Sequence, residues 1–180
     1  MRYKFVAALF LATLPSVPAQ AGVEGWKTAS DIGAYSLMAV SVGLPALQGD
    51  KAGAFQAAGS FGATSLVTEG LKHAFPKTRP DMSDRKSFPS GHTSRSFSAA
   101  ASLMNRQGAK VGVPAFLVAG FVGLARVEGK KHYWTDVLAG AAIGTSIGLL
   151  ITKDRPEEVK TAFVPWADLH GGGFTLVSRF

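Results

Sequence analysis

Four charge-free apolar runs constrain the fold of this 180-residue chain more than any other feature. They hold 15 to 18 residues each, are rich in Ala, Gly, Val and Leu, and cover 32–49, 52–68, 111–125 and 137–152. Runs of this length and composition predict helices that are buried on most sides. A fifth segment, 93–104, has apolar residues at roughly helical spacing among serines and predicts an amphipathic helix. We therefore expect an all-α bundle of about five helices.

The length of these runs does not decide whether the helices cross a bilayer. A spanning helix needs about 20 apolar residues, and the mean hydropathy of the chain is only +0.17. The spacing of Gly140, Gly144 and Gly148 is typical of closely packed membrane helices, and a tightly packed soluble bundle is the alternative.

The positions of the basic residues favour a membrane-embedded bundle. If the N-terminus points outward, the basic turns all face the cytoplasm, as the positive-inside rule prefers: Lys51, Arg106 with Lys110, and Lys153 with Arg155. The polar loops 72–92 and 126–136 then share the outer side. We predict a protein of the bacterial inner membrane whose active site faces the periplasm, with a soluble periplasmic protein as the alternative.

The N-terminal 21 residues resemble an export signal. Arg2 and Lys4 precede an uninterrupted apolar run at 5–14, and Ala19-Gln20-Ala21 fits the small-x-small cleavage pattern. Residues 1–21 are predicted to be a signal peptide, with an uncleaved first membrane helix as the alternative.

The C-terminal tail differs in composition from the helical region that precedes it. Residues 22–156 are predicted to form one helical domain. In 157–180, three consecutive glycines at 171–173 are followed by apolar residues at alternate positions, a pattern that predicts a small β-hairpin.

Charge and cysteine content exclude several classes of protein. The net charge is +7, but the basic residues are scattered among apolar stretches and form no stripe interleaved with aromatic residues, which argues against nucleic acid as a partner. A phosphate-bearing substrate or an anionic membrane surface explains the charge better. Because the chain has no cysteine, disulfides, a thiol nucleophile and Cys-ligated zinc are excluded.

Three polar clusters lie between the apolar helices, where polar and charged residues require a structural or functional explanation. The first is Lys72-x6-Arg79-Pro80, the second is Phe88-Pro89-Ser90-Gly91-His92, and the third is Arg126-x5-His132-x3-Asp136. We interpret these clusters as the parts of one active site.

The second cluster predicts a phosphate-binding helix start. Ser90 stands at an N-cap position, so the backbone N–H groups of the following turn are unpaired and can bind an anion. Gly91 has no side chain to block a ligand, and His92 can donate a proton to a leaving oxygen. Taken alone, a serine in this position is more often a simple helix cap.

The third cluster predicts a nucleophile. If a helix begins near His132, Asp136 lies on the same face one turn later and can accept the imidazole N–H. That bond fixes the tautomer and leaves the other ring nitrogen free to attack. Such a pair is also common as a surface hydrogen bond.

Three cations accompany these groups. Phosphoryl transfer spreads negative charge over three equatorial oxygens, so Lys72, Arg79 and Arg126 suit the transition state. Asp81 and Asp84 do not have the pattern of a two-metal or Mg²⁺ site. We therefore predict a mechanism without metal or other cofactor.

In order and spacing, the three clusters resemble the signature of the phosphatidic acid phosphatase type 2 superfamily, and the resemblance covers about 32–152. It implies an all-α phosphatase in which His132 is the nucleophile, Asp136 its orienting partner and His92 the general acid. The phosphoryl group would be bound by Lys72, Arg79, Ser90, Gly91 and Arg126. The family usually has Ser before the third-motif arginine, where this chain has Ala125, so one phosphate hydrogen bond is in doubt. His73 matches no family role, and we interpret it as structural.

The helices around the predicted site bear on the class of substrate. Apolar helices beside the site favour a lipid phosphate: lipid A, an isoprenoid pyrophosphate or phosphatidylglycerol phosphate. A soluble acid phosphatase acting on small phosphomonoesters is the alternative. A vanadate haloperoxidase and a noncatalytic envelope scaffold are less consistent with the chain, because haloperoxidases are usually much larger and because a scaffold has little reason to keep His92, His132 and Asp136.

Overall fold

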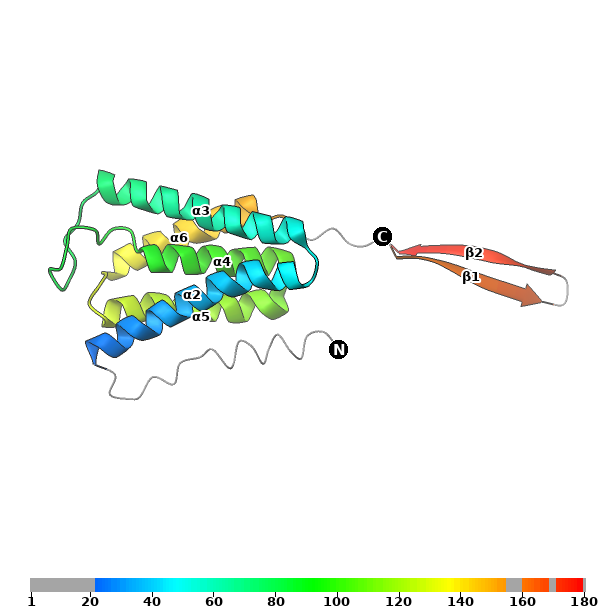
Figure 1. The fold of residues 1–180 in the computed structure, drawn as a ribbon, viewed down its shortest axis with the longest axis horizontal. Helices are drawn as coiled ribbons and strands as arrows, with labels where there is room; N and C mark the ends of the chain where they lie inside the picture. Colours follow the sequence, from blue (N-terminus) through cyan, green and yellow to red (C-terminus); the bar gives the residue numbers. More distant parts are fainter. Residues whose placement is uncertain (1–21, 155–159, 169–170, 180) are drawn as a thin grey trace.

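The computed structural model describes residues 22–154, 160–168 and 171–179, so the predicted signal peptide lies outside the described residues. In this part of the chain, five helices lie side by side as an elongated bundle (Figure 1). They are α2 (Val23–Leu47), α3 (Lys51–Ala74), α4 (Gly91–Gln107), α5 (Ala109–Glu128) and α6 (Trp134–Ile151). The predicted all-α fold is confirmed, with one helix for each of the five predicted segments.

The helices extend beyond the charge-free runs from which they were predicted. α2 begins at Val23 instead of 32, and α3 continues to Ala74 instead of ending at 68. The added turns carry charged residues, which do not interrupt a helix when their side chains reach solvent or a polar partner. One such residue is Glu24, which pairs with Lys27 at 2.6 Å on the surface of α2.

Helix α4 is the centre of the bundle, because it packs against each of the other four helices. Its interior-facing residues are small, mainly serine and alanine, and Ala100 and Ala101 are fully buried. Small side chains let helix backbones approach closely. The segment predicted to be amphipathic is therefore surrounded by the other helices.

The glycines at intervals of four in α6 lie directly against α4. A Cβ atom on Gly140 would lie 2.7 Å from the Ser90 carbonyl oxygen, and one on Gly148 would lie 2.7 Å from that of Ser98. A Cβ atom on Gly144 would overlap the Ser94 carbonyl. Because the obstacle in each case includes backbone, a side chain could be accommodated only if the two helices moved apart.

A buried ion pair fastens the end of the bundle where α2 turns into α3. Arg106 binds both carboxylate oxygens of Asp50, and both side chains are almost completely buried. The same guanidinium donates to the carbonyls of Lys153 and Asp154 beyond α6. Arg106 thus links the end of α4 to the α2–α3 turn and to the segment that follows α6.

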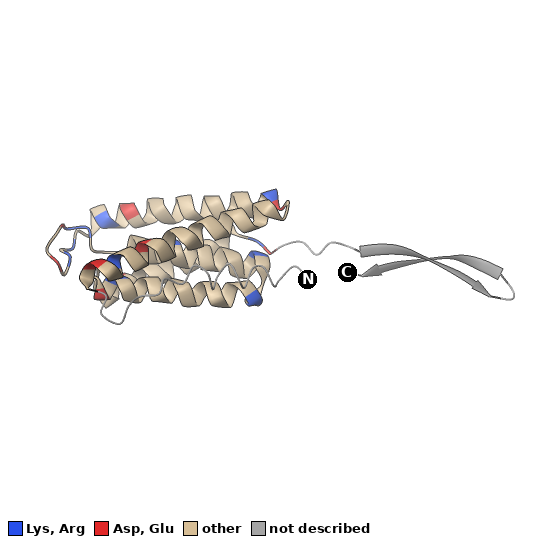
Figure 2. Cartoon of the chain, turned by 60° about the horizontal axis from the view of Figure 1, so that its bottom comes forward, with Lys and Arg blue, Asp and Glu red and all other residues tan. Residues whose placement is uncertain are grey.

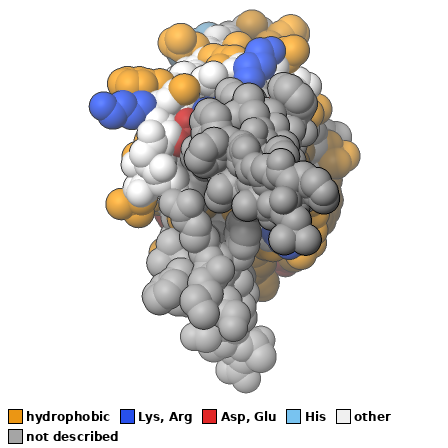
Figure 3. All heavy atoms as spheres, turned by 90° about the vertical axis from the view of Figure 1, so that its right-hand side faces the viewer, with side chains coloured by type: hydrophobic (Ala, Val, Ile, Leu, Met, Phe, Trp, Pro, Cys, Tyr) orange, Lys and Arg blue, Asp and Glu red, His pale blue; other side chains and the backbone are white. Residues whose placement is uncertain are grey.

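Three of the helices are long and apolar enough to cross a membrane: α2, α5 and α6. Charged residues gather at the two ends of the bundle and leave its middle mostly uncharged (Figure 2). Figure 3, which faces the end opposite the polar loops, shows basic side chains beside hydrophobic ones at the visible rim. This distribution suits a bundle with apolar sides and polar ends.

The C-terminal hairpin predicted from the sequence is present. Strands β1 (Lys160–Asp168) and β2 (Gly171–Arg179) pair antiparallel, with Lys160 opposite Arg179 and Asp168 opposite Gly171. In the described part of the chain, these two strands pair with each other and with no further strand.

Candidate active site

Both polar loops lie at the same end of the bundle, together with the start of α2 (Figure 1). One loop joins α3 to α4 and the other joins α5 to α6. A backbone hydrogen bond from Ser90 N to Asp136 O, 3.0 Å long, connects the start of α4 to the start of α6. The three sequence clusters are therefore brought together, as a joint site requires.

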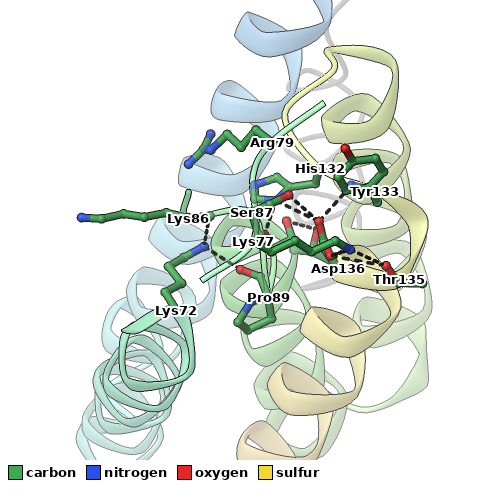
Figure 4. Close-up of polar contacts among 12 residues, drawn as sticks. Lys72, Lys77, Arg79, Lys86, Ser87, Pro89, His132, Tyr133, Thr135 and Asp136 are labelled. Atoms are coloured by element: carbon green, nitrogen blue, oxygen red, sulfur yellow. Dashed lines mark hydrogen bonds and ion pairs between the residues drawn. The ribbon is translucent and has the colours of Figure 1, made fainter. Parts of the chain in front are cut away.

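Lys72 holds the α3–α4 loop in place. Its side chain is buried in the last turns of α3, and Nζ donates to the carbonyls of Lys86 at 2.7 Å and Pro89 at 2.6 Å (Figure 4). Because an ammonium has three N–H donors, one remains for a ligand. Burial is the main reason that the pKa of Lys72 is lowered to about 8, and neighbouring Arg79 and Arg95 act in the same direction. The side chain is still mostly a cation at neutral pH.

His132 is almost completely buried, with 2% of its surface exposed, and its ring meets the loop that precedes α4. Nδ1 lies 2.7 Å from the Ser87 carbonyl oxygen. Because a carbonyl can only accept, Nδ1 must carry the hydrogen and Nε2 keeps its lone pair. Burial, followed by the charges of Arg126 and Lys72, lowers the pKa of His132 to about 3. The ring is thus neutral at neutral pH, with Nε2 available as a nucleophile.

Asp136 does not accept a hydrogen bond from His132, which corrects the expectation from their spacing. Its Oδ2 lies 3.9 Å from His132 Nδ1. The carboxylate instead accepts from Ser87 Oγ at 2.5 Å, Lys77 Nζ at 2.6 Å and Tyr133 N at 3.0 Å. The reason is that α6 begins only at Trp134, so the Asp136 side chain turns back to bind the N-cap residue. Ser87 therefore bridges the two side chains: its hydroxyl donates to Asp136 and its backbone carbonyl accepts from His132 (Figure 4).

The Pro89-Ser90-Gly91-His92 segment starts α4 as predicted, with Ser90 at the N-cap position. The Ser90 hydroxyl is buried and lies 2.9 Å from Thr93 Oγ1, so it does not cap a backbone N–H. A Cβ atom on Gly91 would meet only ordinary contacts, 3.8 Å from Lys72 Cε at the nearest. Packing within the protein therefore does not require this glycine, whereas the approach of a ligand to the first-turn amides would.

Two arginines complete the positive charge of the site. Arg79 pairs with Asp84 through Nε at 2.7 Å within the α3–α4 loop. Arg126, on α5, is 6% exposed, and its Nη1 donates to Ser30 and Asp31 of α2. Its Nε is buried and has no partner in the described part of the chain. An unpaired buried donor of a charged group is costly, so Arg126 is suited to receive an anion.

His92 points toward α2, where its Nε2 lies 3.0 Å from Asp31 Oδ1. Burial, followed by the charge of Arg126, lowers the pKa of His92 to about 3. In the absence of a ligand the ring is therefore neutral at neutral pH. A bound phosphate would add the negative charge that favours its protonated form.

Sequence reasoning missed three residues of this site: Ser87, Lys77 and Asp31. Ser87 directly precedes the Phe88-Pro89 segment, and this position beside the second cluster could have identified it as a site residue. Lys77 binds Asp136 and lies 4.5 Å from the centre of the Tyr133 ring, but its sequence position resembles any loop lysine. Asp31 lies four residues after Lys27, a spacing that on a helix suggests an ordinary surface pair.

The site combines a helix start with a neutral histidine and buried cations. These groups converge at one end of an apolar bundle, and this arrangement places the chain in the class of all-α proteins with a site suited to phosphate. The chain belongs to the PAP2 superfamily, whose family model matches residues 53–160. This confirms the resemblance inferred from the three motifs.

The relatives that the chain matches include proteins named as lipid phosphatases. A lipid A 1-phosphatase of Porphyromonas gingivalis is 37% identical over 82 residues, which are 44% of this chain and 18% of that protein. Lipid phosphate phosphatase 1 of Arabidopsis thaliana is 43% identical in an alignment 76 residues long that covers 34% of this chain and 23% of that protein. The chain thus matches about a fifth of the length of each of these two relatives.

Two solved structures share the fold. Aquifex aeolicus LpxE superposes with a TM-score of 0.62 at 21% identity, covering 80% of this chain and 92% of that one. A transmembrane phosphatidylglycerolphosphate phosphatase of Bacillus subtilis gives 0.59 at 23% identity, covering 83% and 84%. Together with the three apolar helices, this fold favours the membrane-embedded alternative over the soluble one.

Proposed function

We propose that this protein is a metal-independent phosphatase that forms a phosphohistidine on His132. The observation that carries the proposal is the protonation state of that ring and the charges around it. Its Nδ1 is bonded to the Ser87 carbonyl, so its Nε2 lone pair is free, and its neighbours are the cations Lys72, Arg79 and Arg126. A neutral imidazole among buried cations is suited to attack a phosphorus atom whose oxygens those cations bind.

The reaction has two steps. In the first, Nε2 of His132 forms a bond to phosphorus while the bond to the leaving oxygen breaks, and His92 gives that oxygen its proton. In the second, water attacks phosphorus and returns a proton to His92, and the bond to His132 breaks. Asp136 stabilises the imidazolium through Ser87, whose hydroxyl donates to the carboxylate and whose backbone carbonyl accepts from His132 Nδ1.

The proposed phosphate ligands surround this path. Arg126 contributes its unpaired Nε, and Lys72 contributes its remaining N–H. Arg79 adds a third charge. The backbone N–H groups of Gly91 and the rest of the first turn of α4 donate to the phosphate oxygens, and Ser90 sets the helix start.

We infer that the substrate is a lipid carrying a phosphomonoester or pyrophosphate. The site lies at the end of a bundle that contains three helices capable of spanning a membrane, so a phosphate at headgroup level could reach it while its acyl chains remain in the bilayer. The relatives named for lipid A 1-phosphate and lipid phosphate support this class. We propose a periplasmic orientation, because export directed by the predicted signal at 1–21 would place the start of α2, and the site beside it, on the outer side of the membrane.

Phosphate release measured in EDTA tests the proposal. Purified protein in detergent is given a lipid phosphate or a small aryl phosphate, and we expect release that resists EDTA and is faster with the lipid. His132→Ala should abolish release. The matched control is His73→Ala, since His73 lies on α3 beside Lys72 but is exposed and makes its hydrogen bond to the Glu69 carbonyl of its own helix.

A second measurement identifies the intermediate. A ³²P-labelled substrate, quenched during turnover, should leave label on the wild-type chain that survives alkali and is lost in acid, as expected for a phosphorus–nitrogen bond. Loss of all activity in EDTA, or labelling that persists in His132→Ala, would contradict the proposed chemistry. Faster release from the aryl phosphate would instead favour the small-phosphomonoester alternative.

A further inference from the structure

Asp31, on α2, brings a carboxylate to the site that no sequence motif includes. A single oxygen, Oδ1, lies 3.0 Å from His92 Nε2 and 3.2 Å from Arg126 Nη1. These two partners lie on α4 and α5, so Asp31 joins three helices at the point where the proposed acid and a proposed phosphate ligand meet. The Asp31 side chain is 46% exposed, which leaves it room to adjust when a ligand arrives.

The other charged groups around His92 act against its protonation. They are four cations on three helices and one loop: Arg126 on α5, Arg95 on α4 itself, Lys72 on α3 and Arg79 in the α3–α4 loop. The Tyr35 ring of α2 packs edge-on, with its centre 6.2 Å from that of the imidazole. Asp31 is the carboxylate that forms an ion pair with His92 in the described part of the chain.

We propose that Asp31 is a positioning residue for the general acid: it orients the His92 ring and favours the protonated form that can release a proton to the leaving oxygen. The inference rests on the proposed function and adds a residue of α2 to its machinery. When the bond from phosphorus to the leaving oxygen breaks, the proton of His92 moves to that oxygen. The proton is restored when water attacks the phosphohistidine. Asp31 contacts neither the phosphorus nor the leaving group in this scheme.

The dependence on the leaving group separates this role from a purely structural one. An alkoxide needs a proton as it departs, whereas a nitrophenolate is stable without one. A residue that acts through the general acid therefore affects an alkyl phosphate far more than an aryl phosphate. A residue that only neutralises Arg126 would affect both alike, mainly through KM, because Arg126 contacts phosphate oxygens common to both substrates.

The experiment compares Asp31→Asn with wild type in detergent, using dodecyl phosphate and 4-nitrophenyl phosphate. General acids contribute roughly 10²- to 10⁴-fold, so we expect loss of part of this effect: a fall of about 10-fold or more in kcat for the alkyl substrate and of less than about 3-fold for the aryl one. Asp31→Glu should restore part of the loss. Glu24→Gln is the matched control, because it removes an exposed carboxylate from the same helix.

A double-mutant cycle provides an independent readout on the alkyl substrate alone. If Asp31 acts through His92, adding Asp31→Asn to His92→Ala should cause no further loss. Equal losses for both substrates, or additive losses in the cycle, would overturn the inference while leaving the phosphohistidine mechanism intact. Absence of EDTA-resistant turnover by the wild type would instead refute the proposed function. Thermal melting in detergent checks that each variant is folded.

Discussion

Replacing Ser87 with alanine tests how Asp136 acts on His132. The change removes the hydroxyl that donates to Asp136 Oδ2 at 2.5 Å but keeps the backbone carbonyl that accepts from His132. A hydrogen bond to a charged group contributes about 1.5–3 kcal/mol. If all of that is expressed in the transition state, at about 1.4 kcal/mol for each tenfold change, kcat should fall about 10- to 150-fold. Asp136 keeps its other three donors, Lys77 Nζ, Tyr133 N and Thr135 Oγ1, so the fold should persist.

The assay is phosphate release under saturating substrate, together with single-turnover formation of the phosphoenzyme, which isolates the step in which His132 attacks. Ser83→Ala is the control, because Ser83 belongs to the same loop but is exposed and binds only Asp81 and Lys131. A rate within twofold of wild type for Ser87→Ala, combined with a large loss for Asp136→Asn, would refute the reasoning. That result would mean that the carboxylate contacts the imidazole directly during catalysis.

Three further predictions concern stability, measured as the melting midpoint in detergent. Because the pKa of His132 is lowered from 6.5 to about 3, unfolding is favoured as pH falls from about 6.5 towards 3, and His132→Asn should reduce this pH dependence. Gly144→Ala overlaps a backbone carbonyl of α4 and should cost about 1–3 kcal/mol, whereas Gly43→Ala, in open space, should not destabilise. Asp50→Ala leaves the buried charge of Arg106 without this carboxylate, which should cost about 3–5 kcal/mol while kcat per folded molecule stays unchanged.

The helices and the three motifs could be predicted because their signals are local. Apolar runs indicate buried helices wherever they occur, and the motif spacings identify the residues that meet at one end of the bundle. The exact ends of the helices could not be predicted as well. At the start of α2 and the end of α3, charged side chains interrupt the apolar pattern but not the backbone hydrogen bonds.

The pairings inside the site could not be derived in the same way. The spacing of His132 and Asp136 predicts contact only if both are inside one helix, and here the helix begins between them. Asp31 and His92 are separated by most of two helices, so only the packing of α2 against α4 brings them together. Contacts between distant segments depend on how helices rotate and tilt against each other, which local patterns do not specify.

The glycine seam between α4 and α6 has a consequence for how such proteins diversify. The two helices carry the proposed phosphate-binding turn and the carboxylate proposed to support the nucleophile, and their backbones lie too close for any side chain to stand between them. The chemistry thus depends on an inflexible pair, while the outward apolar surfaces of the remaining helices are free to drift. Evolution can refit those outer surfaces to lipids of other shapes, or to bilayers of other thickness, without having to rebuild the catalytic apparatus.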